Sequence, residues 1–261
     1  MDLNLNGKSA IITGGSKGIG YAVAEALAAE GCNVHLVARS KDALEAGAQR
    51  IRDRYQVSVG VHALDLSDST NIKTLLDTAG LPDILVNNAG AIPGGNLEKI
   101  VEDTWREAWD LKVFGYINLC RACYGAMRDR GHGVIINVTG LAAERFDFNY
   151  IAGTTGNAGL NAFTRALGSF SLEDNIRVMA VCPGAVLTER LETLMKTRAE
   201  AELGDASRWQ ELLANLPTGR AATVEEVANV VLFLASDKAS WMTGTVVTVD
   251  GGHGARGGSF R

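Results

Sequence analysis

Near its amino terminus the chain reads Thr13-Gly14-Gly15-Ser16-Lys17-Gly18-Ile19-Gly20. This glycine-rich turn follows an apolar strand-like run, Lys8 to Thr13, and opens a helical pattern from Gly18 to Glu30. Glycine adopts a positive φ without strain, as expected at Gly14, and at Gly18 and Gly20 it lets backbone approach a ligand and the sheet. The first N–H groups of the helix then favour an anion. Glycines alone are equally typical of an ordinary turn, but this position between strand and helix indicates a pyrophosphate-binding site.

Strand-like and helical segments alternate along the rest of the chain. Further strands are predicted over residues 33–38, 57–63, 83–87, 133–138, 176–182 and 245–249, and further helices over 41–54, 68–79, 103–130, 150–170 and 224–235. The strands are apolar almost throughout, which indicates burial on both faces of a parallel sheet. We therefore predict one α/β domain over residues 1–261, a Rossmann-type doubly wound parallel sheet of about seven strands with helices on both sides. A helical insertion around residues 187–215 is expected to cover the substrate side.

Composition and charge narrow the possible functions. The chain has 261 residues, 46% of them hydrophobic, and a formal net charge of −5, which disfavours nucleic acid or an anionic membrane as a partner. No apolar run reaches the roughly 18 residues of a membrane-spanning helix, and the first residues lack a secretory pattern, so we expect a cytoplasmic protein. Cys120 and Cys123 have CxxC spacing but no second pair, which favours buried thiols over a zinc or redox site. The four histidines are scattered, and no metal site is predicted.

The charges around the predicted pyrophosphate site bear on the choice of cofactor. Folds that bind NAD often place a carboxylate at the end of the second strand, where it holds the ribose hydroxyls. Here that strand ends in Ala38-Arg39-Ser40, and Lys17 lies within the glycine turn. Two cations and a hydroxyl suit a 2′-phosphate, which favours NADP(H) over NAD(H). The alternative is that both cations are solvated surface charges.

Several further motifs, in order along the chain, resemble the short-chain dehydrogenase/reductase family over nearly the full length. They are Asp65-Leu66 after the third strand, Asn87-Asn88-Ala89-Gly90 after the fourth, Pro183-Gly184 leading to Thr188, and Asp250-Gly251-Gly252 after the last strand. The resemblance implies hydride transfer between NADP(H) and a small-molecule alcohol/carbonyl pair, and a homotetramer or dimer that pairs the 103–130 and 150–170 helices. The implied cofactor-binding residues are Gly14, Ser16, Lys17, Gly18, Ile19, Gly20, Arg39, Ser40, Asp65, Leu66, Asn88, Ala89, Gly90, Pro183, Gly184, Val186 and Thr188.

The catalytic positions depart from the pattern of this family, which uses Asn, Ser, Tyr and a Lys four residues after the Tyr. Tyr150 matches the tyrosine, but Thr154 replaces the lysine, Gly140 the serine and Lys112 the asparagine. The connection from Gly140 to Tyr150 is also shorter than usual. An ordinary phenol has a pKa near 10 and needs a cation beside it to act near neutrality.

We hypothesise that Lys112 reaches the space left at Thr154 and lowers the pKa of Tyr150, while the adjacent Thr139 hydrogen-bonds the substrate oxygen. Tyr150, Lys112 and Thr139 are thus the predicted catalytic residues. The alternatives are that Lys112 is an ordinary helix residue and the protein binds the cofactor without redox turnover, or that it is an isomerase or lyase. Apolar residues before Tyr150 and after Thr188 either line a pocket for a hydrophobic substrate or serve packing; they are Leu141, Phe146, Phe148, Leu187, Leu191, Leu194, Met195 and Trp209.

Overall fold

A seven-stranded parallel sheet forms the centre of the computed structural model, which describes residues 2–90 and 92–256. The strands lie in the order β3-β2-β1-β4-β5-β6-β7, so the strand order reverses between β1 and β4. This arrangement confirms the predicted Rossmann-type fold. The strand bounds are β1 Ser9–Thr13, β2 Asn33–Ala38, β3 Val59–Ala63, β4 Ile84–Asn87, β5 Gly133–Val138, β6 Ile176–Pro183 and β7 Thr245–Val249.

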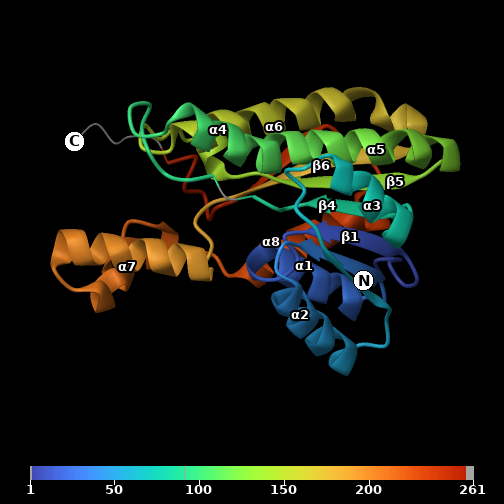
Figure 1. Cartoon of the computed structure of the whole chain (residues 1–261), viewed down its shortest axis with the longest axis horizontal. Coiled ribbons are helices and arrows are strands. Elements are labelled where there is room, and N and C mark those ends of the chain that lie inside the picture. Colours follow the sequence, from blue (N-terminus) through green and yellow to red (C-terminus); the bar gives the residue numbers. More distant parts are fainter. Residues whose placement is uncertain (1, 91, 257–261) are drawn as a thin grey trace.

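Helices cover both faces of the sheet (Figure 1). On one face α1 and α8 pack together with α2, and on the other lie α3, α5 and α6. A separate buried cluster of apolar side chains fills the space on each face, as expected for strands that are apolar on both sides. The helix bounds are α1 Gly18–Ala29, α2 Lys41–Arg54, α3 Thr70–Ala79, α4 Glu102–Trp109, α5 Gly115–Arg130, α6 Ile151–Ser171, α7 Glu189–Leu203 and α8 Val224–Ala235.

The long helix predicted over residues 103–130 is not a single α-helix. A π-helical segment, Asp110–Phe114, separates α4 from α5, and the Gly115 N–H donates to the carbonyl of Asp110, five residues earlier. The wider turn inserts an extra residue without breaking the helix axis. The chain is thus helical from Glu102 to Arg130, close to the predicted bounds, and the irregular segment at its centre, which was not predicted, contains Lys112.

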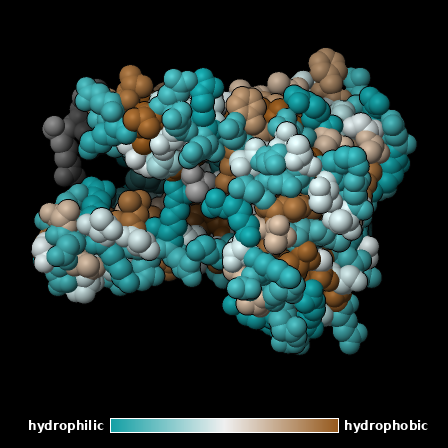
Figure 2. Space-filling view, viewed as in Figure 1, coloured by the Kyte–Doolittle hydropathy of each residue, from teal (hydrophilic) through white to brown (hydrophobic). Residues whose placement is uncertain are grey.

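Beyond β6 the chain forms helices within residues 187–215, where a helical insertion was expected. They are α7 and the 3-10 helix η4, Ala206–Leu213, which pack against each other. The Thr188 hydroxyl accepts from the Leu191 N–H and so caps the start of α7, and Gly204 ends it with a φ of 71°. The pair stands away from the sheet (Figure 1), and a hollow separates it from the layer that contains α4 (Figure 2).

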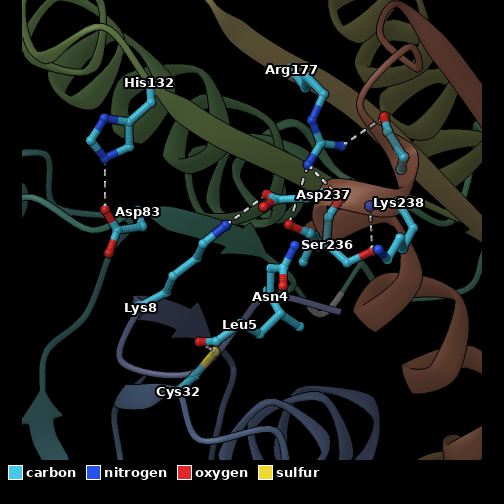
Figure 3. A network of polar contacts seen from close by, with 12 residues as sticks. Asn4, Leu5, Lys8, Cys32, Asp83, His132, Arg177, Ser236, Asp237 and Lys238 are labelled. Carbon is cyan, nitrogen blue, oxygen red and sulfur yellow. Dashed lines mark hydrogen bonds and ion pairs between the residues drawn. The ribbon is translucent and has the colours of Figure 1, made fainter. Parts of the chain in front are cut away.

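At the amino ends of the strands a polar network ties the last part of the chain to the sheet (Figure 3). Arg177 on β6 is buried, and its guanidinium donates to the carbonyls of Leu234, Ala235, Ser236 and Ala239. A cation at these carbonyls stabilises the carboxyl end of α8. The network lies at the opposite end of the sheet from the glycine-rich turn and serves stability.

All four cysteines are buried and free, as predicted. Among the described residues, no helix is long and apolar enough to cross a membrane.

Candidate functional site

The glycine-rich turn connects β1 to α1 as predicted. Gly14 and Gly18 have φ angles of 67° and 58°, so both occupy the left-handed region that favours glycine. The turn is held to the end of β4, because the Thr13 hydroxyl accepts from the backbone N–H groups of Asn88 and Ala89 at 2.8 and 2.9 Å. These bonds join the two strands at which the sheet order reverses, where ligands bind in open α/β sheets.

A cavity of about 750 Å³ opens at this end of the sheet. Twelve of the predicted cofactor residues line it, namely Gly14, Ser16, Lys17, Gly18, Ile19, Arg39, Ser40, Leu66, Asn88, Ala89, Gly90 and Thr188. Bare backbone at Gly14 and Gly18, together with the start of α1, fits the pyrophosphate of a dinucleotide.

Five predicted cofactor residues are not in the cavity wall, namely Gly20, Asp65, Pro183, Gly184 and Val186. Gly20 instead packs against the Gly14 carbonyl, where any side chain would clash. The Asp65 carboxylate accepts from the backbone and hydroxyl of Ser67, and these bonds hold its pKa below the ordinary value. The wall also contains residues that the sequence analysis missed: Val37, Ala38, Leu64, Leu111, Val138, Glu189 and Arg190.

The cations expected to contact a 2′-phosphate both line the cavity, after the adjacent strands β1 and β2. Arg39 follows β2, and the adjacent Ser40 hydroxyl caps α2 by accepting from the Ala43 N–H. Lys17 instead forms an exposed ion pair with Glu189 of α7 at 2.8 Å. An exposed pair of this kind is screened by water and salt and contributes little to stability, so a phosphate can compete for Lys17.

Lys112 extends from the π-helical segment into the cavity wall. Its ammonium donates to the Val138 carbonyl at 2.9 Å and lies 3.5 Å from the Thr139 carbonyl. The stem of Lys112 passes over Gly90, where a Cβ atom would overlap it. Burial, with a further contribution from the positive charge of Arg190, lowers the pKa of Lys112 to about 8. Lys112 can therefore gain or lose a proton near neutral pH.

Tyr150 lies immediately before α6, with its ring folded over Gly153, and does not line the cavity. Its ring packs in a small apolar cluster with Ile92 and Trp109. Burial raises the pKa of Tyr150, and the charge of Arg190 with a hydrogen bond from its guanidinium opposes this shift. The cation that acts on Tyr150 is thus Arg190, whereas the Lys112 ammonium is held at the end of β5.

The face of α6 that meets the end of β5 presents two other residues. Asn157 contacts Gly140 and donates to the Gly153 carbonyl at 2.8 Å, while its side-chain oxygen has no partner among the described residues. The Thr154 hydroxyl lies on another side of the helix, where it accepts from the Asp147 N–H. Gly153 and Asn157, which are four residues apart, therefore lie on the face of α6 that meets the end of β5.

Thr139 and Lys112 come together, and Thr139 also lines the cavity. The Thr139 hydroxyl, however, donates to the Val181 carbonyl at 3.3 Å. It would have to rotate away from that carbonyl to bind a substrate oxygen.

The apolar residues considered for a substrate pocket lie outside the cavity wall. Phe146, Phe148, Leu187 and Leu194 are exposed, and none of the eight candidate residues lines the cavity.

Comparisons with known proteins identify the class to which this fold and cavity belong. A family model described as enoyl-(acyl carrier protein) reductase matches residues 14–254. The chain is 35% identical to 3-oxoacyl-(acyl-carrier-protein) reductase of Escherichia coli over 96% of its length and 98% of the relative's. It is 33% identical to 7alpha-hydroxysteroid dehydrogenase of the same organism, covering 96% of each chain.

Solved structures agree with these relatives. L-sorbose reductase from Gluconobacter frateurii, solved with NADPH and L-sorbose, superposes with a TM-score of 0.92 at 32% identity, over 98% of this chain and 100% of that one. The chain therefore belongs to the short-chain dehydrogenase/reductase family of NAD(P)-dependent oxidoreductases.

Proposed function

We propose that this protein is an NADP(H)-dependent oxidoreductase that interconverts a carbonyl compound and an alcohol, with Lys112 as its proton-transfer residue. The observation that carries the proposal is that one cavity contains both the glycine-rich turn and the Lys112 side chain. NADP(H) supplies or accepts the hydride, and the protein has to supply or accept the accompanying proton.

The preference for NADP(H) rests on the end of β2. Arg39 and Ser40 line the cavity there, and the carboxylate of Asp65 is turned toward Ser67. An arginine offers paired donors to a phosphate, and a carboxylate at this place would repel it.

Lys112 suits proton transfer because its pKa of about 8 lies close to neutral pH. During reduction its ammonium gives a proton to the carbonyl oxygen, and in the reverse direction the neutral amine takes the alcohol proton. Tyr150 stays protonated because its pKa is raised, and it lies outside the cavity wall, so we assign it no proton transfer. Thr139 donates a hydrogen bond to the substrate oxygen once its hydroxyl leaves the Val181 carbonyl.

The test compares Lys112→Met with Lys73→Met, the same change at an exposed lysine on α3. Each protein is incubated with NADPH and a panel of ketones and aldehydes, and NADPH consumption is followed. We expect Lys112→Met to lose roughly 100-fold or more of turnover while NADPH affinity and the control stay within about twofold, because general acids contribute 10²–10⁴. Unchanged turnover in Lys112→Met contradicts the proposal.

A second candidate, cofactor binding without redox turnover, is favoured by one observation. The inner face of α6 carries Gly153 and Asn157, neither of which can act as an acid or base near neutrality. Tight NADPH binding by calorimetry, with no carbonyl reduced by the wild-type protein, would favour this candidate. Conversion of a substrate with unchanged nicotinamide absorbance would instead indicate an isomerase or lyase.

A further inference from the structure

Arg190 is the second residue of α7 and lies in the wall of the same cavity as Lys112 and Thr139. Its guanidinium donates to the Ile92 carbonyl at 2.6 Å and reaches the Tyr150 hydroxyl, which leaves further N–H donors of the planar group. It therefore shares the cavity wall with the proton-transfer residue, whereas Arg39 follows β2, which three strands separate from β6 in the sheet.

The charges at this part of the cavity do not balance within the described residues. The only acidic residue among the lining residues is Glu189, which pairs with Lys17. Among the described residues, 2–90 and 92–256, no carboxylate lies within 4.0 Å of the charged nitrogens of Lys112 or Arg190. Each of these cations instead bonds to a backbone carbonyl, at Val138 and Ile92.

Two neighbouring cations without a counter-ion make a favourable site for an anion. Both side chains line the same cavity, and the positive charge of Arg190 adds to burial in lowering the pKa of Lys112. An anion bound between them would relieve both desolvation and mutual repulsion. A guanidinium matches the geometry of a carboxylate through two parallel hydrogen bonds.

We infer that the substrate is an oxo acid or the corresponding hydroxy acid, whose carboxylate pairs with Arg190 while its carbonyl or hydroxyl oxygen faces Lys112. The inference rests on the proposed oxidoreductase function and names the substrate class of that site. A phosphate of the cofactor is the other anion that Arg190 could take, and the experiment separates the two.

The experiment uses the full-length protein saturated with NADP⁺ and measures binding by calorimetry. The probes are 2-oxohexanoate, 4-oxopentanoate and 5-oxohexanoate, each compared with its methyl ester, which keeps the carbonyl and removes the charge. The variants are Arg190→Gln and, as a matched control, Arg198→Gln, which removes an exposed arginine on the same helix.

We expect the wild-type protein to bind at least one acid about 10- to 100-fold more tightly than its ester, as a charged hydrogen-bonded pair provides. In Arg190→Gln this difference should disappear, with NADPH affinity within about twofold of wild type. Arg198→Gln should behave as wild type. Equal affinity of every acid and its ester in the wild type would overturn the inference, as would a loss of NADPH affinity in Arg190→Gln as large as the loss of acid affinity.

Because these measurements require no turnover, they separate this inference from the proposed reaction. Acid binding through Arg190 without any carbonyl reduction contradicts the oxidoreductase and leaves the carboxylate site intact. Reduction of uncharged ketones, combined with no preference for acids, supports the oxidoreductase and refutes the carboxylate site.

Discussion

The pKa of Lys112 is set by its surroundings in the fold. Its ammonium is held by the Val138 carbonyl, and the Arg190 charge adds to the effect of burial, so that its pKa falls from 10.5 to about 8. A solvated lysine would stay charged throughout the neutral range and would be a poor base.

The first prediction concerns the pH dependence of the reaction. Reduction requires the protonated ammonium, so its rate should fall as pH rises through about 8, whereas oxidation requires the neutral amine and should rise over the same range. Steady-state rates measured in both directions from pH 6 to 10 check this. Profiles without an inflection near pH 8, or with one that persists in Lys112→Met, would argue against the assignment.

The second prediction concerns Arg39 and cofactor choice. Arg39→Ala should weaken NADPH binding about 10- to 100-fold, the value of a hydrogen-bonded charge pair, and change NADH binding by no more than about twofold. Calorimetric titration with each nucleotide checks this, with Arg50→Ala, an arginine on α2 outside the cavity wall, as the control. Equal losses for the two nucleotides would mean that Arg39 does not read the 2′-phosphate.

Residues of the cofactor site were predictable where the local backbone conformation restricts the residue type. Gly14 and Gly18 need left-handed backbone angles, and that requirement is local to the turn. Arg190 was missed because a charged residue in the first turn of a helix is typical of solvated surface, and only the fold brings it beside Lys112. The position of Tyr150 was equally hard to predict, because ring packing over Gly153 depends on the path of the short loop before α6.

At the level of elements, helices and strands followed from apolar periodicity except where the backbone departs from regular geometry. The bounds of β2, α2, β5, α8 and β7 are as predicted. The segment 110–114 was not predicted, because a single wide turn shifts the apolar pattern by only one residue and the next helix restores it.

The adjacent strands β2 and β3 carry a titratable pair that yields the third prediction. The His35 and His62 rings lie 3.0 Å apart between nitrogens, and Gly60 makes room for His35. Burial lowers both pKa values below 6.5, with a smaller contribution to His62 from the charge of His35. The unfolded chain therefore takes up protons first as pH falls, and the free energy of unfolding should decrease below about pH 6.5.

Urea unfolding at a series of pH values between 7.5 and 4.5 measures this effect. The double variant His35→Gln/His62→Gln should show a shallower decrease in the free energy of unfolding between pH 6.5 and 5 than the wild-type protein. Identical slopes for the two proteins would show that the pair does not contribute.

On the scale of the whole molecule, α5 and α6 both cover the same face of the sheet (Figure 1). Glycines of α6 face different ways: Gly156 packs inward against Trp109 and Val113, whereas a Cβ atom at Gly159 would meet nothing within 4 Å. Exposed Gly159 thus leaves a smooth helix surface, as a helix pair between subunits would require.

The fourth prediction is that α5 and α6 form the contact between copies of the chain. Gly159→Arg should convert the dimer or tetramer to a smaller species, measured by light scattering. Ala46→Arg, on the exposed face of α2, is the control and should leave the mass unchanged. A wild-type protein that is monomeric, or an unchanged mass in Gly159→Arg, would contradict the prediction.

The wide turn at 110–114 has a consequence for how this chain tolerates length changes. Removing one residue there would restore ordinary 3.6-residue winding and leave α4 and α5 in nearly the same relative orientation, because the wide turn accommodates one extra residue. Such a deletion should raise the melting temperature, since regular helical hydrogen bonding is recovered. It should also change the direction of the Lys112 side chain, so that its ammonium no longer reaches the Val138 carbonyl on β5. The shortened protein would therefore be more stable than the wild type and would have lost its turnover.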